Sequence, residues 1–301
     1  MTAANPRRPM PIDVVVTIGA FGLTPFLQKL AIVDGVPART VALFTAVFAA
    51  LTAVGVMVAR NPRTPRCLFM PAHRWRLLLL GVLAGGMVTL LAAEALTTTS
   101  ATNRSLVQSA YPAVTLLFAR YLLGERLRVA QYAVIAVLLI GLLLANSDAG
   151  RLRVDTGFWL LAATLPLVGL GDIYGKRLTH QLSSVVIAGG RSVYGAVFLG
   201  VALPLFGVIL PSSPAHWFWI CAAGILQGMG VWTLYRAMNV SKASIVAALV
   251  ASAPLVTVAA EGLFIGLSLD TVQWLGLAVV LVAAAWLGYD SGTERHGGKS
   301  G

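Results

Sequence analysis

The residues best suited to chemistry are polar and ionisable side chains inside long apolar stretches, and the clearest group lies between positions 101 and 123. There Arg104, Gln108, Tyr111 and Thr115 are separated by four, three and four residues, which places them along one face of a helix. A guanidinium on such a face can attract an anionic group such as a carboxylate, while Gln108 and Tyr111 orient it. The alternative is that Arg104 extends to a membrane surface and the other side chains bond neighbouring helices.

A second candidate is Asp172, because a carboxylate in low-dielectric surroundings holds a proton more readily than one in water. This acid is the candidate for proton coupling. Lys176 lies four residues further on, at the spacing of an intrahelical ion pair, and Arg177 follows it. The sequence leaves both interpretations open, a coupling group or a structural ion pair with Lys176.

Other polar and aromatic side chains also qualify as substrate-binding residues. Gln227 and Tyr235 are two helical turns apart with Trp232 between them, which suits an aromatic wall against a bound solute. Aromatic residues near a helix end also serve as anchors at the membrane interface. Gln28 forms a smaller polar stripe with Thr24.

Two more charged residues carry weaker expectations. Arg191 is expected to reach the inner membrane surface rather than a binding site, because arginines near the end of a span extend their side chains to the interface. Glu261 shares a helix face with Thr257 and is expected to act as a gate or to reach the lipid headgroups.

Composition indicates that lipid solvates this chain. Of 301 residues, 58% are hydrophobic and 11% charged, whereas soluble domains are about a quarter charged. The net charge of +11 does not indicate nucleic-acid binding, because the basic residues lie in short gaps between apolar runs. About 20 apolar residues cross a bilayer as a helix. On that basis the sequence predicts an all-α membrane protein with ten spans: 14–33, 40–59, 77–96, 101–123, 129–145, 157–174, 184–210, 215–235, 243–267 and 272–289.

The basic residues also predict the orientation, since short loops rich in lysine and arginine stay in the cytoplasm. Ten spans with both termini inside place 15 basic residues in inner segments and 3 in outer loops. Merging the third and fourth spans would give nine and would place the basic loops of the second half outside. Ten spans are therefore preferred. The expected location is a bacterial inner membrane.

An internal repeat relates the two halves. Residues 95–144 and 237–286 align without a gap at an offset of 142, which matches Pro112 with Pro254, Thr115 with Thr257, Gly124 with Gly266, and Gln131 with Gln273. Each half contains five predicted spans, an odd number, so the second copy enters the membrane from the opposite side. The chain is thus expected to be two inverted five-helix repeats, 1–147 and 156–290, with a linker at 148–155 and a cytoplasmic tail at 291–301.

Pro112 and Pro254 are candidate hinges, because proline removes a helix hydrogen bond and permits bending. Membrane helices also tolerate proline for packing alone. The matching polar positions differ between the copies, since Arg104, Gln108 and Tyr111 correspond to valine, valine and alanine in the second. A substrate site here would therefore depend mainly on the first half.

Signatures of an enzyme are missing from the sequence. The four histidines are isolated, and the chain contains no HExxH, Walker A or cysteine-rich metal spacing. No enzymatic activity, cofactor or metal is expected, and ATP-driven pumping by this chain alone is excluded.

Ten short spans in two five-span halves, with Pro112 in the fourth span, Gly124-Glu125-Arg126 closing it and Gly141 in the fifth, resemble an EamA-type member of the drug/metabolite transporter superfamily. The second copy departs from this pattern, because Gly266 is followed by leucine. The resemblance implies a basket of ten helices that moves small metabolites, often outward. It also covers carriers of cationic drugs.

Together these features predict a secondary transporter that binds a small polar metabolite, such as an amino acid or a related solute, near the bilayer midplane and alternates its access. Its expected partners are this small molecule, the lipid bilayer and possible protons, with no nucleic acid. Two alternatives remain open, a passive uniporter or channel and a multidrug cation efflux carrier.

Overall fold

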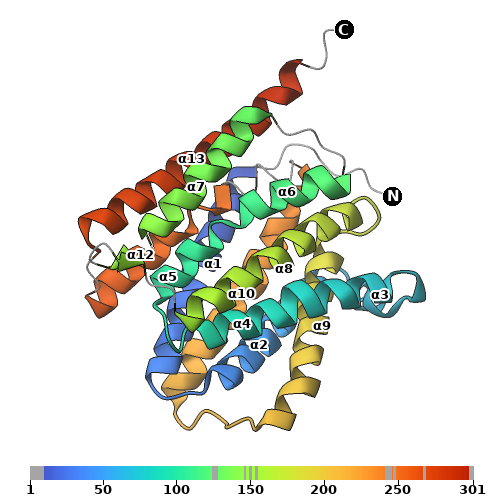
Figure 1. Cartoon of the computed structure of the whole chain (residues 1–301). Helices are drawn as coiled ribbons and strands as arrows, with labels where there is room; N and C mark the ends of the chain where they lie inside the picture. The colour runs from blue at the N-terminus through green and yellow to red at the C-terminus, as the bar shows by residue number, and fades with distance from the viewer. Residues whose placement is uncertain are drawn as a thin grey trace.

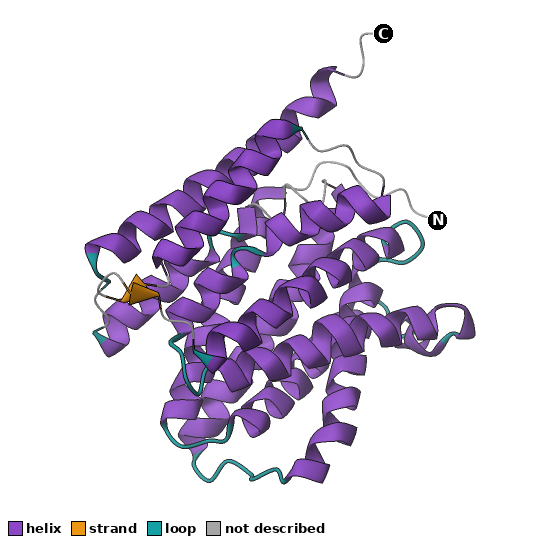
Figure 2. Cartoon of the chain, viewed as in Figure 1, coloured by secondary structure: helices purple, strands orange, loops and turns teal. Residues whose placement is uncertain are grey.

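Helices occupy nearly all of the residues that the computed structural model describes, which are 10–123, 128–145, 147–148, 151–152, 155–240, 246, 249–266 and 269–297 (Figures 1 and 2). The helices are α1 Met10–Val33, α2 Ala38–Arg60, η1 Thr64–Phe69, α3 Pro71–Leu80, η2 Gly81–Met87, α4 Val88–Ala95, α5 Ala101–Gln108, α6 Tyr111–Leu123, α7 Val129–Ala145, α8 Thr156–Leu178, α9 Ser184–Ala202, η3 Leu203–Phe206, α10 Pro214–Val240, α12 Ala253–Ile265 and α13 Thr271–Gly297. In these residues the one strand pairing joins β1 Ser147–Asp148 and β2 Arg151–Leu152 antiparallel.

Six helical segments are long and apolar enough to cross a membrane: 12–33, 38–60, 71–95, 156–178, 184–202 and 214–240. The third of these combines α3, the π-helix η2 and α4 in one rod. The remaining predicted spans contain shorter apolar helices, such as α7 and α12, or an interrupted one. The structure therefore supports an all-helical membrane protein, and the full count of ten crossings stays a prediction.

The third and fourth predicted spans are separate helices, because Leu96–Ser100 interrupts the chain between α4 and α5. Ser100 ends the interruption as an N-cap residue whose side chain accepts a hydrogen bond from the backbone N–H of Asn103 at 3.0 Å. Three threonines at 97–99 thus lie in the turn that divides the two spans, and Ser100 provides the cap.

Helix packing repeats between the two halves. α1 packs against α10 and α12, and its counterpart α8 packs against η2 and α4 and against α6. The counterparts α2 and α9 pack against each other, as do α7 and α13, which lie side by side at one edge of the bundle (Figure 1). Exchanging the halves therefore reproduces the main helix contacts, which is the two-repeat layout that the sequence offset indicated.

Glycines allow close contacts where the halves meet. A Cβ atom on Gly22 of α1 would lie 2.6 Å from the carbonyl oxygen of Ala253 on α12, and one on Gly85 of η2 would lie 2.3 Å from that of Arg191 on α9. Both distances are too short for a side chain, so these helices approach backbone to backbone. The second contact brings Arg191 to the centre of the bundle.

The predicted boundaries near the linker and the tail differ in detail from the structure. α8 begins at Thr156, with Asp155 as its N-cap, and the Asp155 side chain accepts a hydrogen bond from the Phe158 N–H at 2.8 Å. α13 continues to Gly297, so part of the predicted tail at 291–301 is helical. Four linker positions, 149, 150, 153 and 154, and the segment Gly124-Glu125-Arg126 lie outside the described residues.

Candidate functional site

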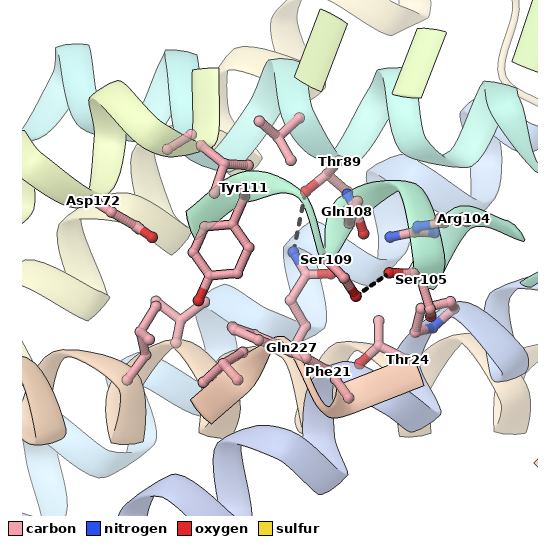
Figure 3. A pocket seen from close by; sticks show the side chains of 18 of the residues that line it. Phe21, Thr24, Thr89, Arg104, Ser105, Gln108, Ser109, Tyr111, Asp172 and Gln227 are labelled. Carbon is pink, nitrogen blue, oxygen red and sulfur yellow. Dashed lines mark hydrogen bonds between the residues drawn. The ribbon is translucent and has the colours of Figure 1, made fainter. Parts of the chain in front are cut away.

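A cavity of about 120 Å³ lies at the centre of the bundle, between the two halves. One water needs about 10–15 Å³ by a comparable measure, so a small solute fits. The lining comes from α1, η2, α4, α5, α6, α8, α9, α10 and α12, and from residues 109 and 250 beside the helix breaks. Its polar lining residues are Thr24, Thr89, Arg104, Ser105, Gln108, Ser109, Tyr111, Asp172, Arg191 and Gln227, of which Figure 3 labels all but Arg191.

Arg104 lies at one end of this cavity and is 6% exposed. Its Nη1 donates to Oε1 of Gln28 on α1. Its Nε is buried without a hydrogen-bond partner, and so is Nε2 of Gln28. Among the described residues no carboxylate lies within ion-pair distance of Arg104. This end of the cavity therefore offers a positive charge and an unused N–H donor, Nε of Arg104.

Asp172 lies at the opposite end, beyond Tyr111, as Figure 3 shows. Its Oδ1 accepts a hydrogen bond from Nη1 of Arg191 on α9 at 3.3 Å, and the same nitrogen donates to the Tyr235 hydroxyl at 3.3 Å. Oδ2 of Asp172 and the hydroxyl of Tyr111 are buried without partners. This end thus combines a paired charge with two unused polar atoms.

The ion pair of Asp172 differs from the one that the sequence offered. Its partner is Arg191, from the neighbouring helix α9, whereas Nζ of Lys176 donates to the backbone carbonyl of Met238. Four-residue spacing permits an intrahelical pair but does not require one. The interpretation of Asp172 and Lys176 as an ion pair is therefore corrected, because Arg191 takes the place of Lys176 as the partner.

Between the two ends the cavity carries neutral polar groups on apolar walls. Nε2 of Gln227 donates to Oγ1 of Thr89 at 3.1 Å, and Oγ of Ser109 donates to the backbone carbonyl of Ser105 at 2.8 Å (Figure 3). Gln108, which is on α5 like Ser105, also lines the cavity. Apolar lining residues are Phe21, Pro25, Ala84, Val88, Leu165, Val168, Val231, Leu234, Val250 and Ala253.

Four of the seven predicted substrate-binding residues line the cavity: Arg104, Gln108, Tyr111 and Gln227. Gln28 stands behind Arg104 and holds its guanidinium. The rotation of α10 explains the other two, because Gln227, Val231 and Leu234 face the cavity and the next residue on a helix is turned by about 100°.

Trp232 therefore points to the end of the bundle where α1 begins, and the prediction that it lines the site is corrected. The guanidinium groups of Arg60 and Arg236 each lie 5.0 Å from the centroid of its ring. Tyr235 is fully buried and lies behind the cavity, where it accepts the hydrogen bond from Arg191.

The predicted hinge prolines begin helices rather than bend them. Pro112 is the second residue of α6, after a two-residue break at Ser109–Ala110. Pro254 is the second residue of α12, after an equivalent break at Ala251–Ser252. Proline fits the first turn of a helix because that turn has no use for its missing N–H. Both breaks lie beside the cavity.

Glu261 is neither exposed to headgroups nor free. It is 3% exposed, and its two carboxylate oxygens accept hydrogen bonds from the backbone N–H groups of Ala101 at 3.0 Å and Thr102 at 2.8 Å. An anion at a helix N-terminus meets unsatisfied donors and the positive end of the helix dipole. Glu261 on α12 therefore fixes the start of α5, and with it the position of Arg104.

Arg191 is the site residue that sequence reasoning placed elsewhere. The predicted span 184–210 overshot, and α9 ends at Ala202, so Arg191 is the eighth of 19 residues and lies near the middle of the helix. Its depth, about 10 Å from the helix start at 1.5 Å per residue, is the signal that could have identified it. Ser105 and Ser109 were also missed, although they are four residues apart and each follows a predicted cavity residue, Arg104 and Gln108.

Comparison with known proteins places this architecture in a class. The family model described as the EamA-like transporter family matches residues 12–147 and 156–289. In addition, 29 chains of solved structures match the fold. One is a crystal structure that carries no more specific name than "protein", which is 18% identical and superposes with a TM-score of 0.72 over 95% of this chain and 99% of that one. None of the curated proteins searched matches the chain.

The family match, together with two matched halves around a central cavity, defines this helical protein as a membrane transporter. The chain is a member of the EamA-like transporter family of the drug/metabolite transporter superfamily. Its members are transporters rather than enzymes, which means that a small-molecule substrate and a lipid bilayer are its partners.

Proposed function

We propose that this protein is a secondary transporter that moves a small carboxylate-bearing metabolite, such as an amino acid or a related solute, across a bacterial inner membrane by alternating access. Arg104 carries the proposal, because it is a buried guanidinium beside a central cavity with no acidic partner among the described residues. A buried charge without a partner is costly, and in membrane proteins it marks a functional site. A substrate carboxylate would supply the missing partner.

The unused N–H group at this end supports an anion over a cation. Nε of Arg104 lacks an acceptor, and a carboxylate offers two oxygens that a guanidinium can bind. A cationic drug would meet an uncompensated positive charge here. The proposal therefore prefers carboxylate transport to cation efflux.

The proposed topology has ten spans in two inverted repeats, 1–147 and 156–290, joined by the linker 148–155. Contacts that recur on exchanging the halves support it. The end of the bundle where α1 begins is proposed to be cytoplasmic, because Arg60 and Arg236 gather there, and Nε of Arg236 lies 3.3 Å from Oδ2 of Asp13. Both termini would then be cytoplasmic, and export is the proposed direction.

Asp172 is the proposed proton-coupling group, since Oδ2 is buried without a partner and can carry a proton. In proteoliposomes a coupled carrier accumulates substrate in response to an imposed pH gradient, whereas a uniporter or channel does not. Asp172→Asn should remove this response, measured as the ratio of uptake with and without the gradient. An unchanged ratio would exclude coupling through Asp172.

The test of the main proposal is carboxylate flux in proteoliposomes that contain the purified full chain. Arg104→Gln should weaken the apparent affinity for carboxylates by about 100-fold, the loss expected for one or two charge-assisted hydrogen bonds. Arg104→Lys keeps the charge and should lose less, about tenfold, because lysine cannot form the forked contact. Saturable transport of cations with no carboxylate flux, or an Arg104→Gln variant that behaves as wild type, would refute the proposal.

A further inference from the structure

The central cavity has two polar ends, and this arrangement constrains the substrate more than a positive charge alone does. Figure 3 shows Arg104 at one end and Asp172 with Tyr111 at the other. Gln28 holds Arg104 from behind, and Arg191 pairs with Asp172. We propose that the transported solute has a carboxylate at one end and a hydrogen-bond donor, an ammonium or a hydroxyl group, at the far end of a short apolar chain. The inference rests on the proposed function and adds the second recognition point.

The chemistry of the unused atoms carries this inference. At the Arg104 end the unused atom is a donor, Nε of Arg104, whereas Gln28 stands behind the guanidinium. At the Asp172 end the unused atoms are the carboxylate oxygen Oδ2, which accepts, and the hydroxyl of Tyr111, which does either. Nearly all buried polar groups in folded proteins have partners, so unpartnered atoms at both ends of one cavity need an explanation. A solute with an acceptor group at one end and a donor at the other satisfies them together.

The separation of the ends excludes the two charged groups of one α-carbon as the matching pair. Arg104 on α5 and Tyr111 on α6 are seven residues apart across the two-residue break at 109–110, a backbone separation on the order of 10 Å at 1.5 Å per residue, and Asp172 lies beyond Tyr111. The ammonium and carboxylate of an α-amino acid share a carbon atom and cannot reach both ends. The distal donor must belong to the end of a chain, as in an ω-amino or ω-hydroxy acid or a basic amino acid side chain.

The walls between the two ends match such a chain. Val88, Leu165, Val168 and Val231 are apolar lining residues, and burying methylene groups against them is favourable by about 0.8 kcal/mol each. The chain would therefore contribute affinity and set the distance between the two polar groups.

The groups around Asp172 determine how its carboxylate binds the donor group of the solute. Oδ1 is already paired with Arg191, which also donates to Tyr235, while Tyr111 faces Asp172 from α6. With Asp172 ionised the pair with Arg191 is neutral overall, so Oδ2 can accept a hydrogen bond from either a charged ammonium or a neutral hydroxyl. This role is compatible with proton coupling, because Oδ2 either carries a proton or accepts the hydrogen bond of the substrate, so binding of the substrate favours release of the proton.

A ladder of ligands tests the inference on the wild-type protein. The probes are straight-chain carboxylates of three to six carbons, each unsubstituted, with an ω-hydroxyl and with an ω-amino group, and the α-amino acids of the same lengths. Binding is followed by thermal shift and by competition with uptake in proteoliposomes. We expect the ω-substituted acids to bind about tenfold more tightly than the unsubstituted ones at one optimal length, and the two substituents to distinguish ammonium from hydroxyl.

Variants locate the second recognition point. Asp172→Asn should reduce the preference for ω-amino over unsubstituted acids to less than about twofold, and the matched change Asp34→Asn, in the exposed turn after α1, should leave it intact. The preference is a ratio within each variant, so a lower yield of folded protein does not alter it. If carboxylates bind through Arg104 and no ω-group improves binding at any length, this inference fails while the proposed function stands. If no carboxylate binds, both fail.

Discussion

The breaks in the fourth and ninth predicted spans have the same backbone arrangement but different side chains. Ser109–Ala110 and Ala251–Ser252 are each followed by a helix with proline as its second residue, at the offset of 142 that relates the two copies. The first copy presents Arg104, Gln108 and Tyr111 to the cavity. The corresponding residues of the second are Val246, Val250 and Ala253, all buried.

The difference separates two requirements that a duplicated transporter must meet. Backbone geometry persists in both copies, which is expected if both must move in equivalent ways. Polar chemistry persists in one copy, which is expected if a single asymmetric solute binds. We infer that the breaks serve movement and that the first copy serves recognition. The following predictions test this division, beginning with the largest effect.

Transferring the arginine to the second copy should be severely destabilising. Val246 is 0% exposed and packs in an apolar cluster with Tyr111 and Leu234. Val246→Arg would bury a charge without a partner, at a cost of about 4 kcal/mol or more in the free energy of unfolding. Thermal unfolding in detergent measures it, with Val246→Met as the control for size alone. If Val246→Arg unfolds at the same temperature as the wild-type protein, the two copies are interchangeable at this position.

The two arginines of the cavity should differ in how much the same substitution destabilises the protein. Arg191 is paired with Asp172, so Arg191→Met leaves a buried carboxylate alone and should destabilise the protein by about 3–5 kcal/mol. Arg104 has no acidic partner among the described residues and loses only the hydrogen bond to Gln28, so Arg104→Met should cost less, about 1 kcal/mol, while carboxylate binding is lost. Equal destabilisation by both changes would show that Arg104 has a structural role.

Glu261 connects the two copies, because a residue of the second positions the polar helix of the first. Glu261→Gln keeps one acceptor for the N–H groups of Ala101 and Thr102 and removes the charge, which should cost about 2–3 kcal/mol. The control is Glu94→Gln. Glu94 pairs with Arg39 at 3.1 Å on the surface, and its loss should cost less than about 1 kcal/mol. Similar melting temperatures for the two variants would contradict the role of Glu261 in fixing the start of α5.

Helical periodicity and the internal offset made part of this site predictable. Arg104, Gln108 and Tyr111 share a face because helix geometry fixes the direction of every third and fourth residue. Pro112 and Pro254 marked two equivalent breaks because proline limits the backbone wherever it occurs. The orientation of α10 was not predictable, since an apolar helix buried on several sides lacks the contrast that distinguishes Val231 from Trp232.

Long-range partners lay further beyond the reach of the sequence. Asp172 and Arg191 are on different helices, and Glu261 reaches Ala101 across 160 residues. Local spacing favoured Lys176 as the partner of Asp172 because it considers only residues on one helix. Only tertiary packing decides between an adjacent partner and one from a neighbouring helix.

The smallest effect on stability is expected at the two prolines. Each occupies the first turn of its helix, where alanine fits equally well, so Pro112→Ala and Pro254→Ala should change the free energy of unfolding by less than about 1 kcal/mol. Alanine nevertheless supplies an N–H that allows helix to continue through the break. If the breaks are hinges, both variants should transport more slowly in proteoliposomes with unaltered equilibrium binding.

Pro166 provides the matched control, because it lies inside α8 on an exposed face and Pro166→Ala should leave the transport rate unchanged. Equal slowing by Pro112→Ala and Pro254→Ala would support a movement shared by the two copies. Slowing by Pro112→Ala alone would assign movement and recognition to the same copy, and the conserved geometry of the second break would then serve packing. Since the two prolines are equivalent in backbone position and differ in polar surroundings, this pair of variants separates the two requirements most directly.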